Sequence, residues 1–216
     1  MINIFRGRER PEMWTRRVGQ GGRWALERIV RPLGAAGVNP NVLTFLGFAV
    51  TLLAALGFAV GWFGWAAAGI FLSGFLDMLD GQVARGSHRV TPFGAFLDST
   101  LDRYSDIMLY MGLVAHYAIA GVFFYVVLAA IAMSSSFMVS YTRARAEALI
   151  PKCKVGFMER PERLVLLILG GAFNRMAPAL WVIAIFATAT VIHRIVHTWR
   201  EIRAGHTLPD SPLGVR

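Results

Sequence analysis

The chain has 216 residues, of which 56% are hydrophobic, and its formal net charge is +9. Soluble domains average about 45–50% apolar residues. Here the excess is concentrated, because residues 32–76 and 107–142 contain no Asp, Glu, Lys or Arg. A run of about 20 apolar residues is long enough to cross a bilayer as a helix. This composition excludes an ordinary soluble domain and predicts an all-α integral membrane protein.

The first 35 residues form a basic segment ahead of the apolar part of the chain. Eight arginines within residues 1–31 are interleaved with tryptophan and aliphatic residues. This mixture is typical of an amphipathic helix that lies on an anionic membrane surface, with Trp at the depth of the headgroups. A partly disordered basic tail is the alternative. We expect residues 1–35 to be a juxtamembrane amphipathic segment.

Six apolar segments follow in a domain that we expect to cover residues 36–200, with a cytoplasmic tail at residues 201–216. Tight links and charged links alternate between them. The predicted transmembrane helices cover residues 42–60, 62–85, 93–117, 122–144, 161–173 and 177–199.

The positions of the basic residues predict the orientation of these helices. Cytoplasmic loops of membrane proteins collect Lys and Arg. With both termini inside, Arg175 is the only one of the 22 Lys and Arg residues that falls in an outer link. The positive charge therefore needs no nucleic-acid partner. We expect a multi-pass protein of the cytoplasmic membrane, with both termini on the cytoplasmic side.

Four aspartates lie where the second and third segments meet. Asp77 and Asp80 are three residues apart, and Asp98 and Asp102 are four apart, so each pair shares one face of its helix. The short link between the segments makes the helices antiparallel neighbours, and the four carboxylates can converge near the cytoplasmic face. Asp106 continues the face of Asp98 and Asp102, and we expect it to be a supporting or surface residue.

Such a group of carboxylates requires compensation inside a membrane. One Asp at a helix centre costs about 2.5–3.5 kcal/mol, so four would cost on the order of 10 kcal/mol if left bare. A divalent cation would remove much of this cost, and oxygen ligands suit Mg²⁺ or Mn²⁺. Gly81, Ala84 and Gly94 leave room for a ligand on the same faces, and Arg85 can contact a phosphate. Pairing with neighbouring arginines is the alternative.

The complete pattern, Asp77-x2-Asp80-Gly81-x2-Ala84-Arg85-x8-Gly94-x3-Asp98-x3-Asp102, resembles the signature of the CDP-alcohol phosphatidyltransferases. The six-span plan is similar to that family as well. The resemblance implies a metal-dependent membrane enzyme, expected to be a homodimer, in which the hydroxyl of a second substrate displaces CMP from a CDP-linked lipid. It also implies two bound ions, a general-base role for Asp102, and metal ligation by Asp77, Asp80, Asp98 and Asp102.

The same resemblance implies which residues contact the nucleotide. Gly81, Ala84, Arg85 and Gly94 belong to the signature and would let the nucleotide approach the helices closely. "NPNVLT", ahead of the first span, resembles the family's entry to that helix, so Asn41 and Thr44 are expected to face the cytidine. Helix capping by Asn39 or Asn41 is the alternative role for these polar residues.

A second group of basic residues lies further along the chain. "SYTRARAE" ends the fourth segment, "GFMERPERL" begins the fifth, and an arginine precedes "HTW" in the last. This arrangement resembles the phosphatidylinositol-phosphate synthases of actinobacteria and archaea, although "IPKCK" departs from their glycine-rich loop. The resemblance implies that the acceptor's phosphate is bound by Arg143, Arg145, Arg163 and Arg194. Arginine suits this role through bidentate contacts with phosphate, and a positive-inside loop is the plainer explanation of the charge.

The predicted function is transfer of the phosphatidyl group of CDP-diacylglycerol to a phosphorylated polyol, with release of CMP. Inositol 1-phosphate is the favoured acceptor and glycerol 3-phosphate the alternative. A divalent-cation transporter is the alternative from another class, since acids within membranes also mark ion pathways. Such sites tend to lie near the midplane, whereas these acids are predicted at cytoplasmic helix ends. A non-catalytic membrane scaffold would need no complete set of aspartates.

Overall fold

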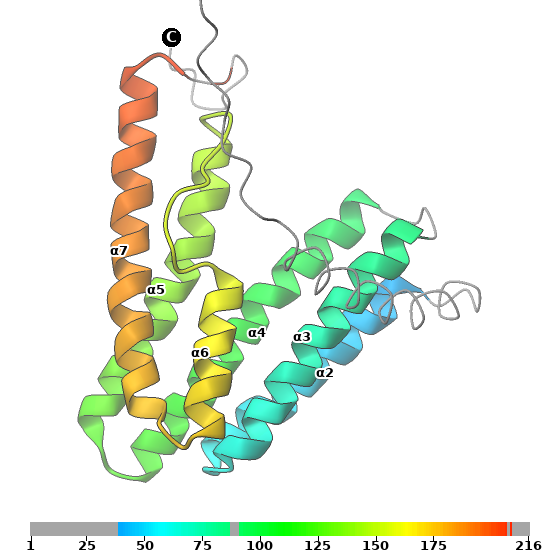
Figure 1. Cartoon of the computed structure of the whole chain (residues 1–216), viewed down its shortest axis with the longest axis vertical. Helices are drawn as coiled ribbons and strands as arrows, with labels where there is room; N and C mark the ends of the chain where they lie inside the picture. The colour runs from blue at the N-terminus through cyan, green and yellow to red at the C-terminus, as the bar shows by residue number, and fades with distance from the viewer. Residues whose placement is uncertain (1–38, 87–90, 207, 209–216) are drawn as a thin grey trace, which may run out of the picture.

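The computed structural model describes residues 39–86, 91–206 and 208, and this part of the chain is all helical, without a strand. Each of the six predicted segments forms a helix close to its predicted position (Figure 1). The predicted N-terminal segment, residues 1–35, lies outside the described residues, as does most of the predicted tail. The helices are α2 (Pro40–Ala59), α3 (Phe63–Gly86), α4 (Pro92–Ile119), α5 (Phe123–Glu147), α6 (Arg160–Ala172) and α7 (Met176–Arg203).

Four of these helices, α2, α3, α5 and α7, are long and apolar enough to cross a membrane. Helix α4 has 28 residues, but it carries Asp98, Asp102, Arg103 and Asp106 within its first fifteen. Helix α6 has 13 residues, which span about 20 Å at 1.5 Å per residue, less than the hydrocarbon thickness of about 30 Å. Six helices are therefore confirmed, and crossing of the membrane by α4 and α6 stays a prediction.

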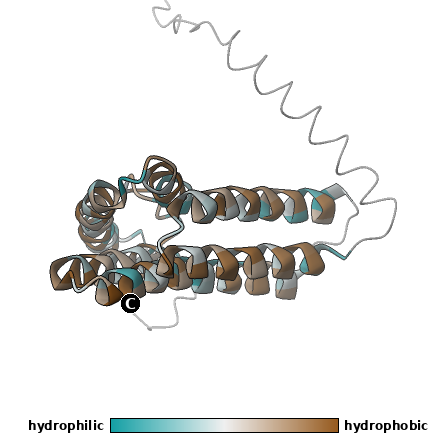
Figure 2. Ribbon diagram, turned by 90° about the horizontal axis from the view of Figure 1, so that it is seen from below, coloured by the Kyte–Doolittle hydropathy of each residue, from teal (hydrophilic) through white to brown (hydrophobic). Residues whose placement is uncertain are grey.

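The helices pack as a closed ring in the order α2, α3, α6, α7, α5 and α4, with α4 packed against α2. Figure 1 shows α6 lying beside α3 although the two are separated by α4 and α5 in the chain. Large apolar side chains point outward from the ring, Trp65 being 79% exposed, and hydrophobic residues cover much of the helices in Figure 2. Apolar surface of this kind is stable against lipid.

The starts of α2 and α4 are fixed by proline and capping residues. Pro40 and Pro92 occupy the first turns of α2 and α4, where a missing N–H costs nothing. Asn39 caps α2 by accepting a hydrogen bond from the Asn41 backbone N–H at 3.0 Å. Thr91 caps α4 in the same way, with Gly94 as donor at 3.0 Å. The cap of α2 is thus Asn39, and the side chain of Asn41 is not used for it.

Helices α2 and α4 approach closely where the chain has a glycine. A Cβ atom on Gly112 would lie 2.2 Å from the carbonyl oxygen of Ala55, which is shorter than any tolerated contact. Phe58, Leu113 and Leu180 are fully buried in the apolar core beside this crossing. The largest apolar cluster therefore lies around this crossing, and a smaller one of Leu43, Leu79 and Val83 lies beside Asp80.

Candidate functional site

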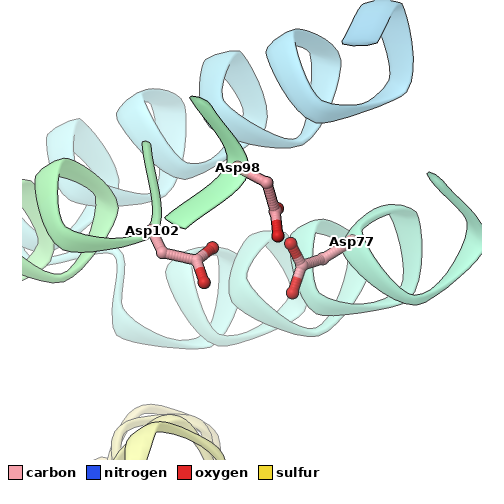
Figure 3. Close-up of side chains that lie close together, drawn as sticks. All are labelled: Asp77, Asp98 and Asp102. Carbon is pink, nitrogen blue, oxygen red and sulfur yellow. The ribbon is translucent and has the colours of Figure 1, made fainter. Parts of the chain in front are cut away.

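Three carboxylates converge between α3 and α4. Asp77 projects from α3, and Asp98 and Asp102 project from successive turns of α4, so that the three point toward one another (Figure 3). One oxygen from each lies within 4.8 Å of the others. The predicted convergence is confirmed for these three side chains.

Asp80 lies apart from this group. Its carboxylate is buried, and its Oδ2 accepts a hydrogen bond of 2.6 Å from the Thr44 hydroxyl on α2. The structure therefore does not bring all four aspartates to one point, because Asp80 is turned toward α2. Metal ligation by Asp80 stays a prediction.

Arg160, at the first position of α6, joins the carboxylates from the opposite side. Its Nη1 lies 2.9 Å from Asp77 Oδ2 and 2.7 Å from Asp102 Oδ1, and its Nε lies 3.5 Å from Asp106 Oδ1. Arg160 was not predicted from the sequence, because the fifth segment was expected to begin at Pro161. Its spacing of three residues from Arg163 was the available signal, since residues three apart share a helix face.

The residues present fit a divalent cation. Asp77, Asp98 and Asp102 offer hard oxygen atoms within 4.8 Å of one another, the ligand type that Mg²⁺ and Mn²⁺ prefer. Asp98 Oδ1 is buried and has no hydrogen-bond partner among the described residues. A buried carboxylate oxygen is costly in this condition, and a cation ligand would satisfy it.

A cavity of about 280 Å³ opens on one side of the carboxylates, between the ends of α2, α3 and α4. It brings together all of the residues that the family resemblance assigned to the nucleotide, and Asp80 and Asp98 line it as well. Those residues are Asn41, Thr44, Gly81, Ala84, Arg85 and Gly94. A Cβ on Gly94 would lie 3.0 Å from Thr91 Oγ1 and 3.4 Å from Asn41 Oδ1, so glycine keeps this wall of the cavity open.

A second cavity, of about 470 Å³, opens on the other side of the carboxylates. Asp102 and Arg160 line it together with three of the four predicted acceptor residues, Arg143, Arg163 and Arg194. Arg145 is absent from this lining. It lines a groove of about 300 Å³ beside Trp199 on α7 instead, because a spacing of two residues turns it to another face of α5. The structure thus places Arg145 outside the cavity that the other three line, although Arg194 lines both spaces.

Two of these arginines are held by backbone carbonyl groups. Arg194 donates from Nε to the Val155 carbonyl at 2.9 Å and from Nη1 to the Val139 carbonyl at 2.5 Å. Arg163 donates to the Met158 carbonyl at 3.2 Å. Both side chains are 1% exposed, and their guanidinium groups are therefore fixed in the wall of the cavity.

Asp106 is the buried partner of Arg163. Its Oδ2 lies 2.5 Å from Arg163 Nη2, and its side chain is 9% exposed. The expected supporting role agrees with this geometry, and a surface position does not. Because the pair carries opposite charges in a buried place, each charge compensates the other.

An apolar groove of about 350 Å³ runs between α3 and α6 and ends at Asp77 and Arg160. The remaining lining residues are almost all apolar, and they are Ile70, Phe71, Gly74, Phe75, Met78, Pro161, Leu164 and Ile168. Three openings therefore meet at the carboxylates: Asp98 lines the first cavity, Asp102 the second and Asp77 the groove.

Comparisons with known proteins place this geometry in a family. The family model for CDP-alcohol phosphatidyltransferase matches residues 38–199. The chain is 37% identical to the archaetidylinositol phosphate synthase of Methanothermobacter thermautotrophicus, over 82% of this chain and 92% of that protein. It is 36% identical to the phosphatidylinositol phosphate synthase of Mycobacteroides abscessus, over 87% of this chain and 91% of that protein.

Solved structures of a Mycobacterium tuberculosis phosphatidylinositol phosphate synthase agree with the fold. The crystal structure with CDP-DAG bound superposes with a TM-score of 0.75 at 30% identity, covering 87% of this chain and 96% of that chain. The structure in complex with manganese and citrate gives a TM-score of 0.73 and covers 87% and 91%. The chain, with its aspartate cluster between α3 and α4, belongs to the CDP-alcohol phosphatidyltransferase family of membrane transferases.

Proposed function

We propose that this enzyme transfers the phosphatidyl group of CDP-diacylglycerol to the hydroxyl of inositol 1-phosphate and releases CMP. One observation carries the proposal: Asp98 lines the cavity with the nucleotide residues, and Asp102, one turn along α4, lines the cavity with the arginines. The carboxylates therefore stand between a place for the donor and a place for a phosphorylated acceptor. Relatives named as inositol phosphate synthases support this choice of acceptor.

The donor would occupy two of the three openings. Its cytidine and pyrophosphate would enter the cavity of about 280 Å³, where Arg85 offers a positive charge and Gly81 and Gly94 allow close approach. Its acyl chains would enter the apolar groove between α3 and α6 from the lipid side. The bound CDP-DAG in the M. tuberculosis enzyme supports a donor of this class.

The acceptor would bind in the arginine cavity. A phosphate group can take two parallel hydrogen bonds from one guanidinium, and Arg143, Arg163 and Arg194 line one space of about 470 Å³. The acceptor's hydroxyl would then face Asp102, at the inner end of the same cavity. Glycerol 3-phosphate carries the same phosphate and is the alternative that the experiment below includes.

The chemistry follows from these positions. Two divalent cations, Mg²⁺ or Mn²⁺, held by Asp77, Asp80, Asp98 and Asp102, would neutralise the pyrophosphate during displacement. Asp102 is placed to take the proton of the attacking hydroxyl. The new oxygen–phosphorus bond forms at the phosphorus that carries the diacylglycerol, and the bond from this phosphorus to CMP breaks. The three arginines hold the acceptor and take no part in these bond changes.

We also propose how the enzyme lies in the membrane. All six helices are embedded, and both termini are cytoplasmic, as the positions of Lys and Arg predict. The enzyme is a homodimer in the bilayer. The orientation is tested with single cysteines, placed in an outer or an inner link after replacement of Cys153. An impermeant thiol reagent should label only the cysteines in outer links.

The proposed reaction is tested with purified enzyme, CDP-diacylglycerol and Mg²⁺. The panel of acceptors is inositol 1-phosphate, glycerol 3-phosphate, inositol and a blank, and mass spectrometry identifies the lipid product. We expect phosphatidylinositol phosphate and an equal amount of CMP with inositol 1-phosphate. The assigned acceptor would be contradicted if glycerol 3-phosphate were the only acceptor that gave a lipid product. It would also be contradicted if unphosphorylated inositol reacted as fast as inositol 1-phosphate.

A further inference from the structure

A glutamate carboxylate already occupies the arginine cavity. Glu159 directs one oxygen, Oε1, at two of the predicted acceptor residues: it lies 3.2 Å from Arg143 Nη1 and 3.1 Å from Arg194 Nη2. Both contacts are charge-assisted hydrogen bonds, the same interaction that a phosphate oxygen would make with these groups.

Glu159 is held in this position and is not needed for another role. It is the N-cap residue of α6, but its side chain makes no capping hydrogen bond. The preceding loop is tied to α7, because the Met158 N–H donates to Thr190 Oγ1 at 3.2 Å and the Val155 carbonyl accepts from Arg194. The carboxylate is therefore positioned toward the arginines by a fixed backbone.

The donors that Glu159 occupies are the ones that face the cavity. Two of the three guanidinium nitrogens of Arg194 donate to backbone carbonyls, and the third donates to Glu159. The Arg194 side chain is 1% exposed, whereas the Glu159 side chain is 41% exposed. An anion that enters from the open side thus meets Glu159 before it reaches Arg194.

We propose that Glu159 is a built-in competitor for the acceptor's phosphate, and this rests on the proposed function of the arginine cavity. The carboxylate neutralises Arg143 and Arg194 while no acceptor is present. A phosphate dianion displaces it because it brings more charge and more oxygen atoms to the same donors. Glu159 thereby raises the concentration of acceptor needed for binding and discriminates against anions weaker than a phosphomonoester.

The test uses the full-length enzyme and inorganic phosphate as probe. Glu159→Gln keeps the size of the side chain and removes its charge. The midpoint of thermal unfolding is measured in detergent at increasing phosphate concentration, with chloride holding the ionic strength constant, and gives the half-saturating phosphate concentration. We expect the half-saturating phosphate concentration to fall about three- to fivefold, since one partly exposed competing ion pair is worth up to about 1 kcal/mol. The acceptor KM should fall in parallel, with kcat changed less.

Glu147→Gln is the matched control. Glu147 also lines the cavity, and its Oε1 lies 3.1 Å from Arg143 Nε. Among the described residues, no hydrogen bond or ion pair joins Glu147 to Arg194. Its removal deletes the same charge from the same cavity, and the half-saturating phosphate concentration should change less than twofold. Glu159→Ala gives a second measurement in the same direction if the Gln variant is not recovered folded.

The outcomes separate this inference from the proposed function. An unchanged or increased half-saturating phosphate concentration in Glu159→Gln would overturn the inference, because Glu159 would then be holding the arginines in place for phosphate. An equal decrease in Glu147→Gln would also overturn it, since the effect would be one of overall charge. A different acceptor in the panel assay would overturn only the proposed acceptor, because the phosphate titration does not depend on the alcohol.

Discussion

Arg160 lies 2.7 Å from Asp102 and thereby places a cation against a carboxylate predicted to bind metal and accept a proton. The same guanidinium lies 2.9 Å from Asp77. A guanidinium and a divalent cation compete for the same oxygens, because both need negative charge close by. Arg160 therefore compensates the acids of the metal-free enzyme and has to share them or move when metal binds.

We expect Arg160→Gln to strengthen metal binding. Removal of the competing charge should lower the half-saturating Mn²⁺ concentration about three- to tenfold, corresponding to about 1 kcal/mol. The metal-free variant should also unfold at lower temperature, because the carboxylates then repel one another. Thermal unfolding over a Mn²⁺ titration, started from protein treated with EDTA, measures both effects.

Arg103→Gln is the control for this prediction. Arg103 directly follows Asp102 on α4, but its guanidinium donates a hydrogen bond to the backbone carbonyl of Ser99. Its loss should leave the Mn²⁺ midpoint within about twofold of the unaltered enzyme. Weaker Mn²⁺ binding in Arg160→Gln would show that the guanidinium assists the metal site.

Asp98→Asn should abolish release of CMP from CDP-diacylglycerol. The substitution removes the charge from a carboxylate whose Oδ1 has no hydrogen-bond partner among the described residues, and we expect a loss of at least about 100-fold, the scale for removal of one electrostatic stabiliser. Radiolabelled CMP release measures the rate. Glu201→Gln is the control and should retain activity, because Glu201 pairs with His206 at the end of α7. Full activity in Asp98→Asn would contradict its metal role.

Arg143 and Arg145 are two residues apart on α5 and should differ in their effect on the acceptor. Arg143 lines the arginine cavity, whereas Arg145 lines the groove beside Trp199. We expect Arg143→Ala to raise the acceptor KM about tenfold, equivalent to one charge-assisted contact of about 1.4 kcal/mol. Arg145→Ala should leave it within about twofold. The donor KM should stay constant in both, and equal effects on the acceptor would contradict the geometry.

Arg163→Ala should act on stability as well as on the acceptor. It leaves Asp106 as a buried charge without its 2.5 Å partner, which costs about 3–5 kcal/mol. The double variant Arg163→Ala with Asp106→Ala should recover part of that loss, because residues in contact are not additive. Thermal unfolding of the single and double variants measures the coupling. Additive losses would show that Arg163 and Asp106 are not energetically coupled, against the contact between them.

Gly112→Ala should destabilise the crossing of α2 and α4. The added Cβ would lie 2.2 Å from the Ala55 carbonyl oxygen, and overpacking of this kind costs about 1–3 kcal/mol or more. Gly64→Ala is the matched control, since nothing lies within 4 Å of its added Cβ and alanine favours a helix. A thermal midpoint in Gly112→Ala equal to that of Gly64→Ala would contradict the close approach.

The sequence predicted the six helices and the meeting of Asp77, Asp98 and Asp102, because local periodicity determines both. Helix bounds follow from apolar runs and from Pro and capping residues, and the three aspartates belong to adjacent helices joined by a short link. The nucleotide residues were predicted from their fixed spacing to the aspartates. They come together in one cavity.

The residues that were not predicted from the sequence contact partners on other helices of the ring. The positions of Arg160 and Glu159 depend on the packing of α6 beside α3. The burial of Asp106 depends on α4, which brings this residue to Arg163. No local pattern encodes that contact. Arg145 was grouped with Arg143 because both belong to the motif "SYTRARAE" that carries the family resemblance. Their spacing of two residues turns them to different faces of α5, which only the placement of α7 makes visible.

The order of helices around the ring has a consequence for biosynthesis. A chain grows from its N-terminus, so α3 and α4 are made with their acids before the ribosome has made α6. During that interval neither Asp77 nor Asp102 has Arg160 as a counter-charge. The nascent protein must therefore shelter these acids by other means, with water or an ion, until the short helix α6 packs beside α3. Docking of α6 thus supplies the counter-charge of the acids, and the later packing of α7 against α6 and α5 closes the ring.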